Sequence, residues 1–464
     1  MQRTDWVIYG AGISALVLAE RLGSAGNRVM LISPSKSWGG IFGGIHINGD
    51  IYDVGMTNFE FDLFGEPSND IQNYHPDRKP DVGRYVHFAK DYLARFVETV
   101  PLATPRMQFG SQVVDDLIIS NHFDILAVLP PEVRMAIRKE LEGILAAPNL
   151  LHPRTKSELH SPLATKSLES ASLANHGPTF HGLLIEPMFR KVLGISSAEI
   201  AGVFHRNGWV PLFYPESLLS QFGPSPQSLQ PTLFHYPKDV NFGGFIERIA
   251  DVVRRLPNVK IVYNAKDIEI DLIGSTIQIG VEEFSFQRLA WGGDIGQLTN
   301  TFHKTLPPTK RADLDLFFLK VKDEGVINKF TVLLDPEEIS PFYRVTNQSI
   351  CAGATYPEHK IILECNSHRW GEDSPDKSRI LDAALTRYGI DPKAIVSCHR
   401  RSFKGALAIP SIGQMTSFNR QRQYIEEEFP EVELIGASSG YVSVTLNDHI
   451  IQALKIARQE GVHI

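Results

Sequence analysis

The sequence predicts an α/β protein that combines a Rossmann-like parallel sheet of the ββα type with a discontinuous α+β region containing a mainly antiparallel sheet. Near the amino terminus, a short buried strand is followed by a glycine turn and a helical pattern. Near the carboxyl terminus, a strand, a run of small residues and a helix follow one another. Between residues 311 and 399, four short strand-like runs are separated by turn residues. The first two features predict the parallel sheet, and the third predicts the antiparallel one.

The first glycine turn joins a strand over residues 5–9 to a helix whose apolar residues recur from Leu16 to Leu22. Its pattern is G-x-G-x-x-A, formed by Gly10, Ala11, Gly12, Ile13, Ser14 and Ala15. In this pattern the first glycine allows a sharp reversal, the second lets a pyrophosphate approach the backbone, and the final small residue lets the helix pack on the strand. An ordinary glycine turn is the alternative, but the position between a strand and a helix favours a dinucleotide site.

A second strand is predicted over residues 28–32 and ends at Ser33, where dinucleotide-binding folds often place an acidic residue for the ribose hydroxyls. The chain then reaches Gly39 and Gly40, in a stretch so rich in glycine that the backbone must either approach a ligand closely or form two tight turns. A strand-like piece over residues 50–59 follows and contains Gly55.

These spacings, from Ser33 to the glycine pair and on to Gly55, resemble the flavoprotein superfamily of protoporphyrinogen oxidase, the flavin amine oxidases and UDP-galactopyranose mutase. The resemblance implies a non-covalently bound FAD whose pyrophosphate meets the first glycine turn and whose flavin end lies along the second glycine pair. The chain departs from the family at Ser33, which stands for the ribose-binding acid, at Ile41, which stands for a basic residue, and at Met56-Thr57, which stands for Pro-His.

A long insertion is predicted from residue 66 to 234, with helices over residues 86–100, 123–147 and 177–194. The last of these carries Arg190 and Lys191 beside a largely apolar surface. It resembles the family segment in which a helix of the substrate domain ends in a basic pair, and Arg190 is therefore a candidate substrate-binding residue. The alternative is a solvated pair that complements the helix dipole.

The chain is expected to return to the first domain near residue 235, with a helix over residues 245–256 and strands over 259–263 and 264–270. In the resembling family, a residue just after the first of these strands lends its backbone to the adenine. This places Lys266 or Asp267 at the adenine.

The second excursion, over residues 311–399, contains strand-like runs over residues 317–321, 330–334, 350–354 and 360–365. Its sheet would form the floor of a substrate pocket. Between the second and third runs, Tyr343 and Arg344 resemble the family segment that brings an arginine towards the substrate, which in the mutases is a nucleotide diphosphate. An arginine fork suits a diphosphate or a carboxylate, but a structural arginine paired within the sheet is an equally good explanation.

A strand from residue 432 leads to Gly436, and a helix over residues 450–458 begins near Asn447 and Asp448. A helix start offers free backbone amides and a positive dipole end to an electron-rich group. The order resembles the closing motif of the family, in which this helix points at the flavin. An N-cap role for Asn447 or Asp448 is compatible with that position.

With 464 residues, the chain is expected to divide into an FAD-binding domain of residues 1–65, 235–310 and 400–464 and a substrate-binding domain of residues 66–234 and 311–399. The net charge of -7 argues against nucleic acid as a partner. The three cysteines form no C-x-x-C pair, which fits a reducing, cytoplasmic location, and no apolar run is long enough for an integral membrane segment. No Cys/His cluster has the spacing of metal ligands.

The pattern identifies no catalytic residue, so the chemistry is expected to be that of the cofactor. The first hypothesis is an FAD-dependent oxidoreductase in which a small-molecule substrate gives a hydride to the flavin. The second is a non-redox mutase in which reduced FAD acts on a nucleotide sugar, and the third is a flavin-binding protein without turnover. The sequence leaves open the identity of the substrate, the electron acceptor, a homo-oligomeric state and a peripheral membrane contact.

Overall fold

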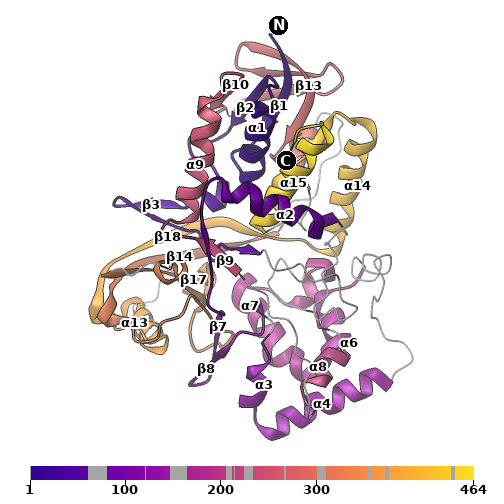
Figure 1. The fold of residues 1–464 in the computed structure, drawn as a ribbon. Coiled ribbons are helices and arrows are strands. Elements are labelled where there is room, and N and C mark those ends of the chain that lie inside the picture. Colours follow the sequence, from indigo (N-terminus) through magenta and orange to yellow (C-terminus); the bar gives the residue numbers. More distant parts are fainter. Residues whose placement is uncertain are drawn as a thin grey trace.

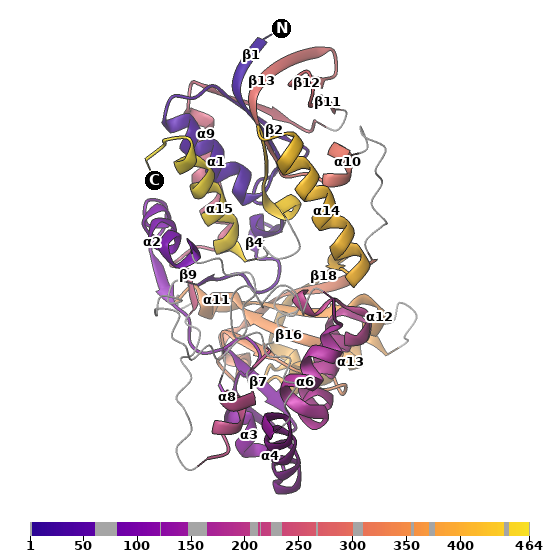
Figure 2. The same ribbon diagram turned by 90° about the vertical axis from the view of Figure 1, so that its right-hand side faces the viewer.

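The computed structural model describes residues 2–60, 81–120, 122–146, 165–204, 212–213, 215–223, 234–265, 268–299, 310–353, 357–370, 376–439 and 445–463. Within these residues the chain forms one large sheet in the upper half of Figure 1 and another in the lower half, and both chain ends lie with the upper sheet (Figure 1). A group of helices extends beyond the lower sheet, at the end of the molecule away from the chain termini (Figure 2).

The first sheet has the strand order β10, β2, β1, β13, β12, β11, and β19 pairs with the carboxyl-terminal part of β13. Its strands are β1 (Gln2–Tyr9), β2 (Val29–Ser33), β10 (Val259–Tyr263), β11 (Ile268–Asp271), β12 (Thr276–Ile279), β13 (Glu282–Trp291) and β19 (Val432–Leu434). The strands β10, β2, β1, β13 and β19 run parallel, whereas β11 and β12 form an antiparallel extension. The predicted Rossmann-like parallel sheet is therefore confirmed.

Helices cover both faces of this sheet, and alternate residues of its strands therefore pack into two different cores. Trp6 and Ile8 of β1 belong to a core shared with α1, α9 and α15, whereas Val7 and Tyr9 belong to a core shared with α10 and α14. The bounds are α1 (Ile13–Ser24), α9 (Phe242–Arg255), α10 (Ile295–Thr299), α14 (Ile412–Glu428) and α15 (Leu446–Gln459). This burial on both faces explains why residues 6–9 of β1 and residues 29–32 of β2 are continuous apolar runs.

The second sheet has the strand order β18, β14, β17, β16, β15, β7, β8. Its strands are β7 (Arg106–Phe109), β8 (Gln112–Asp115), β14 (Lys310–Lys322), β15 (Val332–Leu334), β16 (Phe342–Asn347), β17 (Glu358–Asn366) and β18 (Ile395–Ile409). Apart from the parallel pair β15 and β7, its described neighbours are antiparallel, so the predicted mainly antiparallel sheet is also confirmed. The hairpin of β7 and β8 comes from the insertion, where the sequence predicted only helices.

Smaller elements join the two sheets. They include a hairpin of β3 (Ile45–Ile47) and β4 (Asp50–Tyr52), and a small sheet of β5 (Phe59–Glu60), β6 (Thr99–Pro101) and β9 (Phe234–Pro237). The other helices are α2 (Asp81–Ala94), α3 (Asp124–Val128), α4 (Pro131–Ala146), α6 (Leu168–Phe180), α7 (Glu186–Leu193), α8 (Pro215–Ser220), α11 (Gln348–Cys351), α12 (Ser367–Trp370) and α13 (Lys377–Arg387). Short helical turns are η1 (Gly40–Gly43), the π-helical η2 (His181–Ile185), η3 (Ser197–Glu199), η4 (Gly202–Phe204), η6 (Asp323–Gly325), η7 (Pro392–Ala394) and η8 (Gly436–Ser439).

The strand predicted over residues 350–354 is wrong for residues 350–353, and residue 354 lies outside the described residues. Residues 348–351 form α11, because the side chain of Asn347 caps this helix by accepting a hydrogen bond from the backbone N–H of Ile350 at 3.2 Å. The strand of this region is instead β16, which contains Tyr343 and Arg344. Both residues therefore lie inside the second sheet and not in a connection between strands.

Several predicted helices have different bounds. The helix predicted over residues 86–100 is α2, which ends at Ala94 before β6 begins. The helix predicted over residues 123–147 is divided into α3 and α4 at Pro130. The closing helix begins at Leu446, directly before the predicted start near Asn447 and Asp448.

The long strand β18 continues in the second sheet to Ile409, beyond residue 399, where the predicted second domain ends. The assignment of the two domains to cofactor and substrate stays a prediction. No helix within the described residues is both long and apolar enough to cross a membrane.

Candidate functional site

The parallel strands of the first sheet end along one common edge. In open α/β sheets, ligands bind in the crevice outside this carboxyl edge. The strand ends along it are Tyr263 of β10, Ser33 of β2, Tyr9 of β1, Trp291 of β13 and Leu434 of β19. Gly10 follows β1 directly, and Gly436 lies just beyond β19, so glycines from both ends of the chain reach the same edge.

The first glycine turn lies against the second glycine pair. Gly10 has a φ angle of 141°, which makes the sharp reversal after β1. The N–H of Gly39 donates to the carbonyl of Ala11 at 2.7 Å, and Gly12 and Gly39 form a parallel bridge. A Cβ added to Gly40 would lie 3.8 Å from the Cα of Gly12. The structure therefore brings these five predicted residues together.

Gly12 differs from the glycines of the second turn in what surrounds it. It caps α1 with φ and ψ angles of -75° and 168°, which any residue can adopt, and a Cβ added to it meets no described atom within 4 Å. A Cβ on Gly39 would lie 2.8 Å from the backbone N of Gly43, and one on Gly43 would overlap the carbonyl oxygen of Trp38. Gly39 and Gly43 are thus required by the fold, whereas Gly12 keeps the space before α1 clear.

The first turn of α1 combines apolar packing with an unpaired polar group. Ile13, Ser14 and Ala15 are each 2% exposed, and Ile13 and Ala15 pack into the core shared with α15. The hydroxyl oxygen of Ser14 is buried and has no hydrogen-bond partner among the described residues. A buried hydroxyl without a partner is uncommon in folded proteins, and it fits a polar ligand at this helix start.

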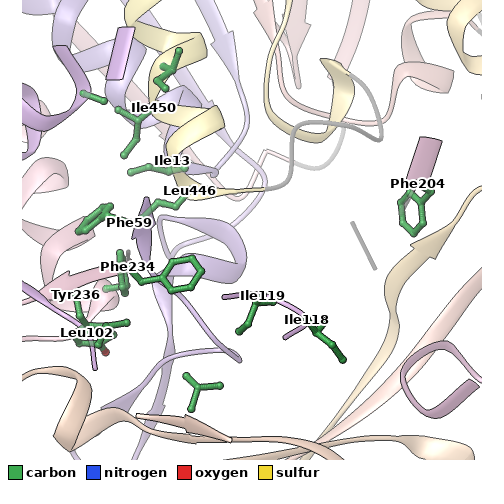
Figure 3. Packing of buried hydrophobic residues seen from close by; sticks show 14 of the residues in the cluster. Ile13, Phe59, Leu102, Ile118, Ile119, Phe204, Phe234, Tyr236, Leu446 and Ile450 are labelled. Atoms are coloured by element: carbon green, nitrogen blue, oxygen red, sulfur yellow. The ribbon is translucent and has the colours of Figure 1, made fainter. Parts of the chain in front are cut away.

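The closing helix α15 begins beside α1. Leu446, its first residue, packs in the same core as Ile13 (Figure 3). Thr445 is the N-cap, and its hydroxyl accepts from the N–H of Asp448 at 3.2 Å while the Asp448 carboxylate accepts from the N–H of Thr445 at 3.2 Å. Asp448 is therefore the third residue of a capping box, and Asn447 is 4% exposed within the same turn.

Gly436, the other predicted residue at this end, has a φ angle of 59°, and a Cβ added to it meets no described atom within 4 Å. Its N–H donates to Oε1 of Gln452 in α15 at 2.9 Å. The turn after β19 is thus tied to the closing helix, and both approach the start of α1.

Two further residues of this region were not predicted. Trp38, directly before the glycine pair, is 2% exposed, and its Nε1 has no hydrogen-bond partner among the described residues. Nδ1 of His449, in the first turn of α15, is also buried without a described partner, and its ring meets the ring of Phe42 in η1 at 5.8 Å. Burial lowers the pKa of His449 to about 4, so this imidazole is neutral at physiological pH. Neither residue belongs to a glycine motif, so spacing alone could not identify them.

At the end of β2, where a ribose is expected, the hydroxyl of Ser33 is already hydrogen-bonded within the protein. Ser33 is fully buried, and its hydroxyl donates to the carbonyl of Ser35 at 2.6 Å and accepts from the Ser35 N–H at 3.1 Å. The hydroxyl thus closes its own turn, and the ribose role of Ser33 stays a prediction. Lys266, predicted at the adenine, lies outside the described residues, as does Asp267.

Gly55 lies against Arg344 from the second sheet. It has a φ angle of 77°, and a Cβ on it would lie 2.8 Å from Nη2 of Arg344 and 3.0 Å from Oε2 of Glu364. Nε and Nη2 of Arg344 donate to the two carboxylate oxygens of Glu364 at 2.5 and 2.7 Å, and the Tyr343 hydroxyl donates to Oε2 at 3.1 Å. Arg344 is 4% exposed, so the pairing within the sheet that the sequence left open is present. A contact of Tyr343 or Arg344 with substrate stays a prediction.

Arg190 and its neighbour Lys191 have opposite surroundings. Arg190 is largely exposed and donates from Nε to Glu186 of its own helix at 2.6 Å. The ammonium of Lys191 is buried and donates to the backbone carbonyls of Asp335 at 2.7 Å and Glu337 at 2.5 Å. Burial lowers the pKa of Lys191 to about 8.

Asp53 connects the turn at Gly55 to three other segments. Its carboxylate accepts from the Tyr236 hydroxyl and from the N–H of Phe242 at 3.1 Å, at the start of α9, and its own N–H donates to Gln348 of α11 at 3.0 Å. Burial raises the pKa of Asp53 to about 6, although these hydrogen bonds act in the opposite direction. The turn between β4 and β5 is therefore held by β9, α9 and α11.

Comparison with solved structures identifies this architecture. A reduced UDP-galactopyranose mutase superimposes with a TM-score of 0.71 at 16% identity, covering 100% of this chain and 95% of the mutase chain. A protein from Exiguobacterium assigned as a protoporphyrinogen oxidase gives a TM-score of 0.65 at 13% identity, with 99% and 98% of the two chains covered. The cyclohexylamine oxidase of Brevibacterium oxydans gives 0.60 at 15% identity, with 99% of each chain covered.

The chain has the fold of this flavoprotein superfamily. The three structures are of the three kinds that the sequence motifs resemble, and the likeness extends over both sheets. No protein-family model and no curated protein sequence matches the chain. At these identities the likeness concerns the fold, so the reaction has to be inferred from the residues of the chain itself.

Proposed function

We propose that the chain binds FAD non-covalently along the carboxyl edge of the first sheet and acts as an FAD-dependent oxidoreductase on a small-molecule substrate. The observation that carries the proposal is the clear space before Gly12, at the start of α1 and beside the buried, unpaired hydroxyl of Ser14. The backbone N–H groups of this first turn and the positive end of the helix dipole are suited to a pyrophosphate. The fold shared with flavoenzyme structures supports the same cofactor.

The other residues of the edge would hold the remaining parts of the cofactor. Gly39 and Gly40 pass close to Gly12 and would lie along the flavin end. The start of α15, kept in place by the capping box between Thr445 and Asp448, would direct its N–H groups towards negative charge on the reduced ring. Asp448 would act through the helix start, because its carboxylate already accepts from Thr445.

When bound, FAD supplies the acceptor for a hydride from a carbon next to nitrogen, oxygen or an extended π-system. The chain has to bind and orient the substrate and exclude water. The turn at Gly55 meets the second sheet at Arg344 and Glu364, and Asp53 anchors the same turn to α9 and α11. The proposal places the substrate beside this junction, with an activity of the amine oxidase or protoporphyrinogen oxidase type.

The absorption spectrum of the purified protein tests the cofactor, and anaerobic titration tests the reaction. A yellow protein whose flavin is bleached by one class of amine, alcohol or reduced tetrapyrrole would support an oxidoreductase. A colourless protein that takes up no FAD during incubation would contradict the cofactor. A loaded flavin that no carbon substrate reduces would favour a catalytically degenerate flavin-binding protein.

A non-redox mutase is the second candidate, and the likeness to UDP-galactopyranose mutase favours it. It would require a cation for a nucleotide diphosphate, but the guanidinium of Arg344 is buried and donates two hydrogen bonds to Glu364. Thr57 also stands where the sequence resemblance leads one to expect a histidine. Turnover of a nucleotide sugar that needs prior reduction but consumes no reductant stoichiometrically would reverse the ranking.

A further inference from the structure

Two aromatic side chains lie beside Ser33 at one end of the carboxyl edge. Tyr263 is the last residue of β10, and it is in register with Ser33, the last residue of β2, in the parallel ladder. Dinucleotide-binding folds hold the adenosine ribose at the end of this second strand. The side chain of Tyr263 is therefore next to the place that the adenosine half of a dinucleotide would occupy.

The ring of Tyr263 has the properties of a stacking surface. It is 40% exposed, although it is a large side chain on a strand of the sheet. Its ring meets the ring of Trp38 edge to face at 5.6 Å, and its hydroxyl interacts with the guanidinium of Arg254 of α9. These two contacts hold the ring in one orientation while leaving part of it accessible. Purine bases stack on such rings without regard to their hydrogen-bonding pattern.

Trp38 adds a polar group at the same place. Its Nε1 is buried and has no hydrogen-bond partner among the described residues, which is an uncommon and costly state for an indole N–H. The hydroxyl of Ser33, in contrast, both donates and accepts within its own turn. Among the described residues, the end of β2 thus offers neither a carboxylate nor a free hydroxyl to the adenosine, whereas Nε1 of Trp38 is an unsatisfied donor nearby.

We propose that Tyr263 and Trp38 form the recognition site for the adenosine half of FAD. Tyr263 supplies an aromatic surface for the purine, and Nε1 of Trp38 donates a hydrogen bond to the adenosine half. The inference rests on the proposed function because it requires a dinucleotide on this edge. It implies that these two side chains determine the preference for FAD over FMN, which lacks the adenosine half.

The test measures the dissociation constants of FAD and FMN for the apoprotein by quenching of flavin fluorescence. Tyr263→Ala should weaken FAD binding about 5- to 150-fold, the range measured for the loss of one stacked base, and Tyr263→Phe should keep the affinity. Trp38→Phe removes the indole N–H together with the five-membered ring that carries it and should weaken FAD about 2- to 10-fold. FMN binding should change in none of the three variants.

Ile273→Ala is the matched control, because Ile273 is 83% exposed in the turn between β11 and β12 of the same sheet and should not alter either affinity. Thermal unfolding of each apoprotein shows whether a variant is folded. An equal loss of FAD and FMN affinity in Tyr263→Ala, or no loss of either, would overturn the proposal, since a structural role does not distinguish the two flavins.

Failure of the proposed function gives a different result. If the wild-type protein binds neither flavin, the FAD proposal fails, and the adenosine site is then examined with AMP alone. AMP binding that Tyr263→Ala removes would support adenosine recognition, and an absence of AMP binding would overturn it.

Discussion

Replacement of Gly12 by aspartate should leave the apoprotein stable but prevent FAD from binding. The backbone at Gly12 has ordinary extended angles, and an added Cβ meets no described atom within 4 Å. Gly12 is the N-cap of α1, and α1 has neither a side-chain cap nor an acidic residue in its first turn. Aspartate is a preferred N-cap, a few tenths of a kcal/mol better than glycine, and its charge adds about 0.3–1 kcal/mol at a helix start. The Gly12→Asp apoprotein should therefore be as stable as the wild type or about 1 kcal/mol more stable.

The effect on the cofactor should be the opposite. An aspartate at this position would place a carboxylate in the space proposed for the pyrophosphate, where repulsion and lost volume prevent binding. FAD at about one hundred times its dissociation constant should add about 2.7 kcal/mol to the unfolding free energy of the wild type and nothing to the variant. Absorbance of the purified proteins and unfolding with and without FAD measure both effects.

Gly43→Ala is the control for this experiment, because its Cβ would overlap the carbonyl oxygen of Trp38. It should destabilise the apoprotein itself, whereas Gly12→Asp should not. A yellow Gly12→Asp protein with a full complement of FAD would refute the site. A Gly12→Asp apoprotein that does not fold would show that the space around Gly12 cannot accept a side chain.

Three further predictions concern buried charges. Arg344→Ala leaves the carboxylate of Glu364 buried without its partner and should lower the free energy of unfolding by about 3–5 kcal/mol in chemical denaturation. Arg344→Met combined with Glu364→Leu should recover most of this loss. Wild-type stability of the single variant would contradict the pairing. Burial raises the pKa of Asp53 to about 6 from an ordinary value of 3.8, so the folded protein binds more protons than the unfolded chain between these pH values. Asp53 therefore contributes about 2–3 kcal/mol to the free energy of unfolding below pH 4, and this contribution is lost as the pH rises through 6. Asp53→Asn should flatten the dependence of unfolding free energy on pH in that window, and an unchanged slope would count against it. Burial lowers the pKa of Lys191 to about 8, so the unfolded chain binds more protons between pH 8 and the ordinary value of 10.5, and stability should rise with pH there by up to about 1.4 kcal/mol per pH unit. Lys191→Met should lack this rise relative to the wild type, and parallel pH profiles would show that the ammonium is not buried.

The backbone of the candidate site was largely predictable because its parts are encoded locally. The strand, glycine turn and helix around Gly12 follow from the order of neighbouring residues, as does the strand, turn and helix after Gly436. The prediction that these two ends approach each other came from the family resemblance, and the packing of α1 against α15 agrees with it. The antiparallel arrangement of the second sheet was predictable from its short strand-like runs. The helix α11, which forms where a strand was predicted, was not predictable, because it depends on one capping side chain.

The roles of individual side chains were harder to predict. The sequence allowed Arg344 to be either a ligand for a diphosphate or a structural arginine, and the pairing of β16 with β17 brings Glu364 to 2.5 Å from it. Arg190 and Lys191 are neighbours in sequence, yet one is exposed and the other buried because they lie on different sides of α7. A carboxylate or carbonyl that arrives from a distant segment has no signature in the local pattern.

The sequence by itself determined the parallel sheet, the two glycine turns and the helix starts that face its carboxyl edge, because backbone preference and apolar periodicity are properties of adjacent residues. Only the tertiary structure showed that Gly12 leaves a clear space before α1, whereas Gly39 and Gly43 are glycines because a Cβ there would clash with the backbone. It also decided that the hydroxyl of Ser33 closes its own turn, and that Tyr263 stands beside that turn in register. Burial and pairing depend on the atoms that folding brings together, and many of those atoms come from segments that are distant in the sequence.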